Sequence, residues 1–190
     1  MDLPVITIVS GLPRSGTSMM MSMLEAGGIE ALTDRIRQAD EDNPGGYFEF
    51  EGVKNLSENT AWLAQARCRS VKVVSRLLYD LPAGYHYKVI FMSRDIDEVL
   101  ASQRQMLLRR GQNEEGVEDE KLRGMFIRHL QDVGNWLGRQ QHFETLYIRY
   151  DEVLAHPPQQ SHRVNQFLGG GLDEVSMAAV VDEKLYRQRK

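Results

Sequence analysis

The chain has 190 residues, of which 42% are hydrophobic and 26% charged, a composition typical of a globular domain rather than a disordered chain. Its formal net charge of -4 argues against a general nucleic-acid-binding protein, whose binding surface would be basic. Its one cysteine, Cys68, excludes an intrachain disulfide and a metal site built from cysteines.

The length suits one domain, and we expect a single domain over residues 1–190. No run approaches the roughly 20 apolar residues that are needed to span a bilayer. Residues 4–9 (Pro-Val-Ile-Thr-Ile-Val) lack the basic and long apolar regions of a signal peptide. We therefore expect a cytoplasmic protein without a membrane span.

Strand-like and helix-like segments alternate along the chain. Val5–Ser10 is short, apolar and rich in β-branched residues, and Thr17–Ala26 has helix-forming composition and stops at a glycine pair. This alternation predicts an α/β fold with one mostly parallel sheet flanked by helices on both faces. Further strands are expected at Ser70–Ser75, Tyr87–Ser93 and Thr145–Tyr150, and further helices at Ile96–Leu107, Leu122–Leu137 and from Asp151 to before Pro157.

Two segments interrupt this alternation. Thr33–Gly52 is polar and rich in turn residues, and it ends in aromatic residues. Arg109–Glu120 is charged and contains glycines, which predicts a surface loop or lid.

The segment Gly11–Ser18 lies between the first expected strand and the first helix, where phosphate-binding loops occur. Gly11 and Gly16 keep the glycine spacing of the pattern G-x-x-x-x-G-K-[ST], but Thr17 replaces its lysine. Arg14 supplies a cation three residues earlier. Glycines let successive N–H groups face one anion, and the helix N-terminus adds a favourable field. An anion site is therefore expected, the alternative being a strand-to-helix turn without a ligand.

The sequence Pro13-Arg14-Ser15-Gly16-Thr17-Ser18 resembles the 5′-phosphosulfate loop of sulfotransferases that use 3′-phosphoadenosine 5′-phosphosulfate (PAPS), written P-[KR]-[SA]-G-T-[ST]. The resemblance implies a P-loop NTPase-like topology and PAPS as the sulfuryl donor. Because a sulfuryl group carries less charge than a phosphoryl group, we expect no bridging metal ion. The resemblance also implies that Arg14 stabilises the leaving group. It further implies that the loop holds the 5′-phosphate through Ser15, Gly16, Thr17 and Ser18.

A second part of the resemblance concerns the 3′-phosphate of PAPS. Arg94 ends the expected third strand, and Ser102 follows eight residues later on the next helix, which is similar to the family's 3′-phosphate site. Helical geometry places Ser102 on the flank of that helix, off its apolar stripe. Tyr150-Asp151-Glu152 resembles the family's Y-[ED]-[DE] step, which implies a position for Tyr150 near the adenine.

The chain also departs from the cytosolic small-molecule sulfotransferases. Met19 stands where they carry a tryptophan, and Lys72-Val73-Val74 keeps a lysine of their lysine–x–histidine step but lacks the histidine that serves as general base. We expect Lys72 to act near the transferring group. The chain's own histidines fall in no motif and are expected at the surface: His86, His129, His142, His156 and His162.

A carboxylate can replace the missing base, because the chemistry needs only a proton acceptor beside the acceptor hydroxyl. The segment Asn43–Glu49 resembles the N-P-x-G-[YF]-[FW]-E segment of compact bacterial-type sulfotransferases, whose glutamate faces the reaction centre. This resemblance makes Glu49 the predicted base, with Glu51 a weaker alternative. Both are otherwise ordinary surface carboxylates.

The sequence thus predicts transfer of a sulfuryl group from PAPS to a hydroxyl or amine of a small-molecule or carbohydrate acceptor. Two alternatives stay open: a P-loop small-molecule kinase that uses ATP and Mg²⁺, and a non-catalytic protein that binds 3′-phosphorylated nucleotides. Thr17 in place of the lysine argues against the kinase. The missing histidine favours the non-catalytic binder. The identity of the acceptor and the oligomeric state have no signal in the sequence.

Overall fold

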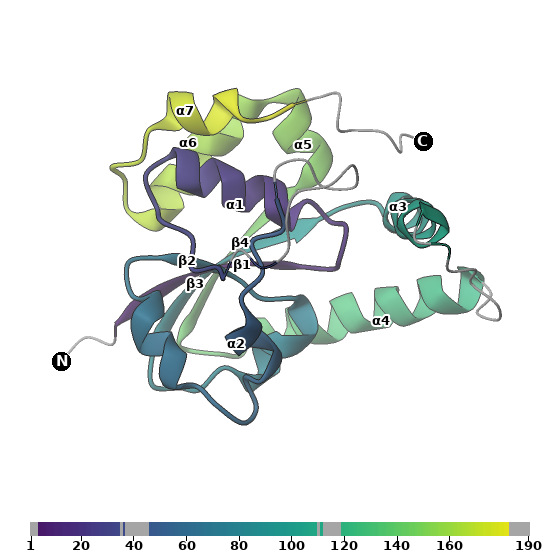
Figure 1. The fold of residues 1–190 in the computed structure, drawn as a ribbon, viewed down its shortest axis with the longest axis horizontal. Helices are drawn as coiled ribbons and strands as arrows, with labels where there is room; N and C mark the ends of the chain where they lie inside the picture. Colours follow the sequence, from purple (N-terminus) through teal and green to yellow (C-terminus); the bar gives the residue numbers. More distant parts are fainter. Residues whose placement is uncertain (1–3, 35, 37–45, 110, 112–118, 183–190) are drawn as a thin grey trace.

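The computed structural model describes residues 4–34, 36, 46–109, 111 and 119–182. They form an α/β fold around a four-stranded, all-parallel sheet of order β2-β1-β3-β4 (Figure 1). The predicted parallel sheet is thus confirmed. The strands are β1 (Val5–Gly11), β2 (Ser70–Lys72), β3 (His86–Ser93) and β4 (Phe143–Arg149).

Helices cover both faces of this sheet, as predicted. In Figure 1, α1, α6 and α7 lie above the sheet, and α2 and α4 lie below it. The helices are α1 (Thr17–Ala26), α2 (Glu51–Lys54), α3 (Ile96–Arg109), α4 (Asp119–Leu137), α5 (Tyr150–Ala155), α6 (Pro157–Leu168) and α7 (Glu174–Ala179), with 3₁₀-helices η1 (Ala61–Ala66) and η2 (Ser75–Asp80).

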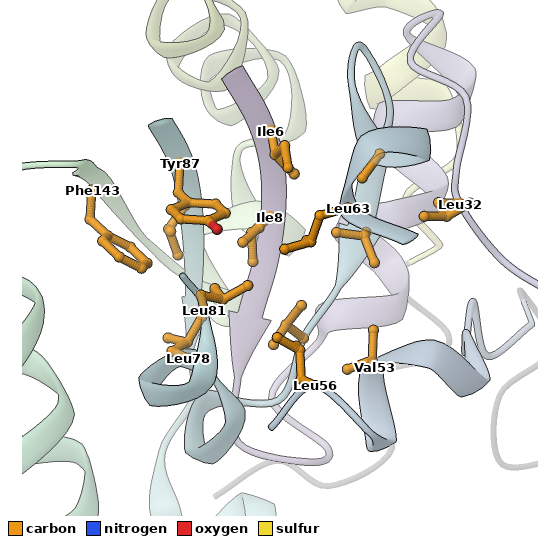
Figure 2. Packing of buried hydrophobic residues seen from close by; sticks show 14 of the residues in the cluster. Ile6, Ile8, Leu32, Val53, Leu56, Leu63, Leu78, Leu81, Tyr87 and Phe143 are labelled. Atoms are coloured by element: carbon orange, nitrogen blue, oxygen red, sulfur yellow. The ribbon is translucent and has the colours of Figure 1, made fainter. Parts of the chain in front are cut away.

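Each face of the sheet has its own hydrophobic core, because successive strand residues point to opposite sides. On one face Ile6, Ile8 and Tyr87 pack against η1, η2 and α4 (Figure 2). On the other face Val9 and Ile90 pack against α1 and α7. The two cores fix the strand ends, and therefore the loops that follow them.

β1 and β3 are each one residue longer than predicted, and β2 and β4 differ by two or three residues at one end. β2 ends at Lys72 rather than at Ser75, because the chain past Val73 leaves β1 and Ser75 begins η2. β4 runs from Phe143 to Arg149, and Tyr150 already begins α5. The last thirty residues, which carried little sequence pattern, include most of α6 and all of α7.

The expected surface loop at 109–120 is bounded by helices: α3 continues to Arg109 and α4 begins at Asp119. Residues 110 and 112–118 of that loop lie outside the described residues, as do Asn43, Pro44 and Gly45 of the segment before Glu49. Within the described parts of the chain, no helix has the length and apolar character that a membrane crossing requires.

Candidate active site

The loop after β1 turns sharply through three left-handed residues. Gly11, Arg14 and Gly16 have φ angles of 146°, 71° and 97°. Ser15 closes the turn: its N–H and its hydroxyl both donate to the carbonyl of Leu12, at 3.2 and 2.7 Å. Ser15 is buried, and both its N–H and its hydroxyl are thus engaged within the loop, so its predicted contact with the 5′-phosphate stays a prediction.

The loop leads into the N-terminus of α1, which begins at Thr17 after Gly16. No side chain caps this end of the helix, and its first turn contains no acidic residue. Unpaired N–H groups and the helix dipole favour an anion at such an end. The start of α1 is therefore where an anion would be stabilised, and its use as a 5′-phosphate site stays a prediction.

Two arginines meet beside this loop. Arg14 donates from Nε to the hydroxyl of Ser102 at 2.9 Å, and Arg94 donates from Nη1 to the carbonyl of Arg14 at 3.3 Å. Arg94 also pairs with Glu98 (3.0 Å), and both of these side chains are only 8% exposed. The structure therefore brings Arg14 from the loop after β1 together with Arg94 and Ser102, which stand about 80 residues or more later in the sequence. Ser102 is buried.

Tyr150 packs under the loop and the arginines. Its ring lies 4.5 Å from the Arg94 guanidinium, and a Cβ added at Gly16 would come within 2.4 Å of ring atom Cδ2. Burial raises the pKa of the Tyr150 hydroxyl, although Arg94 and Arg14 act in the opposite direction. Tyr150 thus stays neutral and supports the loop from below.

The variant Gly16→Ala is expected to disrupt the loop. An alanine at φ 97° is strained, and its methyl group would overlap the buried Tyr150 ring. We expect a lower melting temperature and a large loss of affinity for 3′,5′-adenosine bisphosphate (PAP), measured by thermal unfolding and calorimetry. Gly84→Ala is the control, since a Cβ there meets nothing within 4 Å. Wild-type PAP affinity in Gly16→Ala would contradict this role of the loop.

The remaining predicted residues lie near the end of β2 and the segment before α2. The ammonium of Lys72 donates to the backbone carbonyl of Tyr47, which is buried. The carbonyl of Glu49 accepts hydrogen bonds from the Thr33 hydroxyl (2.8 Å) and the Asp34 N–H (3.2 Å). Hence Lys72, at the end of β2, contacts the segment before α2 at Tyr47, two residues before Glu49.

The carboxylate of Glu49 has an electrostatic influence on α2. The pKa of the exposed Lys54 is raised, mainly by its hydrogen bond to Glu51 and to a smaller extent by Glu49. The role of Glu49 as base stays a prediction.

Sequence reasoning missed Glu98 and the pair Ser75–His129. Glu98 stands four residues after Arg94, a spacing at which opposite charges pair on a helix. His129, expected at the surface, is half-buried, and its Nε2 lies 2.7 Å from the buried Ser75 hydroxyl. No sequence spacing could reveal this pair, since 54 residues separate its members. By contrast, His162 is exposed, as expected.

Comparisons with known proteins assign the family. The family model for the sulfotransferase domain matches residues 5–190. The chain therefore belongs to the sulfotransferase domain family, and the predicted enzyme class, sulfuryl transfer, is confirmed.

Solved structures share the fold. The sulfotransferase domain of the curacin biosynthetic pathway is 16% identical with a TM-score of 0.57, covering 97% of this chain and 90% of its own. A sulfotransferase from Mycobacterium tuberculosis is 16% identical with a TM-score of 0.60, covering 95% of this chain and 71% of its own. A mouse sulfotransferase solved with PAP is 17% identical with a TM-score of 0.54, and the match covers 95% of this chain and 64% of the mouse chain. A search of curated protein sequences found no match.

Proposed function

We propose that this chain transfers a sulfuryl group from PAPS to a hydroxyl or amine of a small-molecule acceptor. The single observation that carries the donor assignment is the cluster in which Arg14, Arg94 and Ser102 meet beside the uncapped start of α1. These hydrogen-bond donors suit a ligand with two separate anionic groups. One anion fits the N-terminus of α1, and a second fits beside the guanidinium of Arg94.

PAPS, when bound, supplies an activated sulfuryl group attached to its 5′-phosphate. We assign the 5′-phosphate to the backbone N–H groups of residues 16–18 and to the hydroxyls of Thr17 and Ser18, while Ser15 shapes the loop through its bonds to Leu12. Arg94 and Ser102 hold the 3′-phosphate, and Tyr150 supports Arg94 through the contact of guanidinium and ring. Among the neighbours, retinol dehydratase was solved with retinol and PAP, and the mouse sulfotransferase with PAP, which supports this type of donor.

Arg14 stabilises negative charge on the departing phosphate, since its guanidinium is fixed by Ser102 next to the loop. Lys72 lies at the end of β2, where its ammonium orders the segment 47–49 and adds positive charge near the transferring group. Glu49 is the proton acceptor that the sequence resemblance puts forward. A single domain, a cytoplasmic location and a carbohydrate as an alternative acceptor belong to the same proposal.

Labelled sulfate tests this function directly. The chain is incubated with PAPS carrying ³⁵S and with a phenol (2-naphthol), an alkyl alcohol (octanol) and an amino sugar (glucosamine) in parallel. We expect label on at least one acceptor, with release of PAP in equal amount. Tight binding of PAP without transfer to any acceptor or to water would instead support the non-catalytic binding protein.

A further inference from the structure

The pair Ser75–His129 lies at the same edge of the sheet as the loop and Lys72. In β2, Lys72 is opposite Val9, and the Val73 N–H still donates to the Val9 carbonyl at 3.0 Å. Val9 stands two residues before Gly11, where the loop begins. Ser75 follows two residues after Val73 as the first residue of η2, so it lies just beyond the end of the strands.

Helix α4 brings His129 to this edge from below. Helix α4 packs against η2, and in Figure 1 it extends past the sheet beneath α3. His129 lies near the middle of α4, and its Nε2 is 2.7 Å from the Ser75 hydroxyl. The Ser75 side chain is 2% exposed, so it is a fixed anchor for the half-exposed imidazole.

The other ring nitrogen of His129, Nδ1, has no hydrogen-bond partner within the described part of the chain. When Nε2–H donates to Ser75, Nδ1 carries a lone pair and can take a proton. A base oriented through its second nitrogen by a buried partner is the arrangement that general-base histidines require.

We propose that His129, oriented by Ser75, takes the proton of the acceptor substrate in place of Glu49; this inference rests on the proposed sulfuryl transfer. The acceptor oxygen forms a bond to sulfur while the bond between sulfur and the 5′-phosphate oxygen breaks. The hydroxyl proton passes to Nδ1, and the phosphate keeps the electron pair of the broken bond. The imidazolium then returns its proton to water.

The electrostatic surroundings of His129 agree with this role. Burial lowers the pKa of the imidazole, Arg76 on η2 lowers it further, and Asp132 on α4 acts in the opposite direction. Because the pKa lies below the ordinary value of about 6.5, the ring is neutral at neutral pH. Turnover is therefore expected to be level at neutral pH and to fall as the pH drops through this lowered pKa.

Histidine ¹⁵N NMR on the full chain tests the geometry without any acceptor. His129 is assigned by comparison with His129→Gln, and the protonation of each ring nitrogen is read at neutral pH. We expect a proton on Nε2 and none on Nδ1, and a mixture of the two tautomers in Ser75→Ala. A neutral ring protonated on Nδ1 would overturn the proposal, because Nδ1 then has no lone pair to offer.

Single-turnover release of PAP from PAPS, with 2-naphthol and with water alone, tests the chemistry. We expect His129→Gln to slow release by about 10²-fold while PAP affinity stays unchanged. His162→Gln is the matched control, since His162 pairs with Glu174 on the exposed side of α6, and we expect it to match wild type.

The variant Glu49→Gln, measured alongside, separates the two candidate bases. If PAP release is slowed in Glu49→Gln but keeps the wild-type rate in His129→Gln, the assignment of His129 is overturned. If wild type releases no PAP in either condition, the proposed function fails, and the NMR experiment alone decides the geometry of His129.

Discussion

Replacing Arg14 by alanine is expected to lower turnover by about 10²- to 10³-fold, the cost of removing one fixed donor from a developing negative charge. Arg14 suits this role because its backbone shapes the loop and its Nε is held by Ser102 at 2.9 Å. The fixed position matters, because a donor that needs no reorganisation stabilises the transition state more than the ground state. Steady-state and single-turnover release of PAP measure the effect.

Two controls accompany Arg14→Ala. Arg139→Ala removes an exposed arginine beyond the end of α4 and is expected to leave turnover unchanged. Arg14→Lys keeps the charge but loses the planar donor fork, so we expect an intermediate rate. If Arg14→Ala weakens PAP binding as strongly as it slows turnover, Arg14 acts in binding rather than on the leaving group.

The charge of Arg94 is expected to account for recognition of the 3′-phosphate. Charge-assisted hydrogen bonds of buried arginines are worth about 1.5–3 kcal/mol, so their loss weakens binding by about 10- to 100-fold. We therefore expect weaker binding of PAP and unchanged binding of adenosine 5′-monophosphate, which lacks the 3′-phosphate. Calorimetry with both ligands gives this selectivity.

The choice of variant has to take into account that Arg94 and Glu98 form a buried ion pair. Arg94→Ala alone leaves the Glu98 carboxylate buried without its partner, which costs about 3–5 kcal/mol of stability. The double variant Arg94→Gln with Glu98→Gln removes both charges together and is the better test of binding. Unchanged selectivity for PAP in the folded double variant would show that Arg94 does not contact the 3′-phosphate.

The fold was readable from the sequence because the strands are short, apolar runs and the glycines of the loop stand at a diagnostic spacing. The predicted strand ends were less accurate. The strand expected to reach Ser75 stops at Lys72, because only three residues of β2 pair with β1. Arg14, Arg94 and Ser102 were predicted for one donor site, and the structure brings them together, while their role in binding stays a prediction. Their individual contacts were not predicted, since sequence spacing could not show that Ser102 bonds to Arg14 rather than to Arg94.

Residues that act through distant partners were the hardest to predict. Glu98 belongs to no motif and is one of two acidic residues in the first turn of α3, yet it is buried against Arg94. His129 became distinctive only when folding brought it to Ser75, because contacts between η2 and α4 depend on the packing of both elements on the sheet. Patterns of local spacing carry no information about such contacts.

The central claim is that the site selects a 3′-phosphorylated nucleotide, and calorimetry on the wild-type chain tests it most directly. PAP, ATP and ATP with Mg²⁺ are titrated separately under the same conditions. We expect PAP to bind at least about 10-fold more tightly than ATP with or without Mg²⁺, because only PAP places a phosphate against Arg94 and Ser102. Binding of ATP with Mg²⁺ that equals or exceeds that of PAP would contradict this claim and favour a kinase.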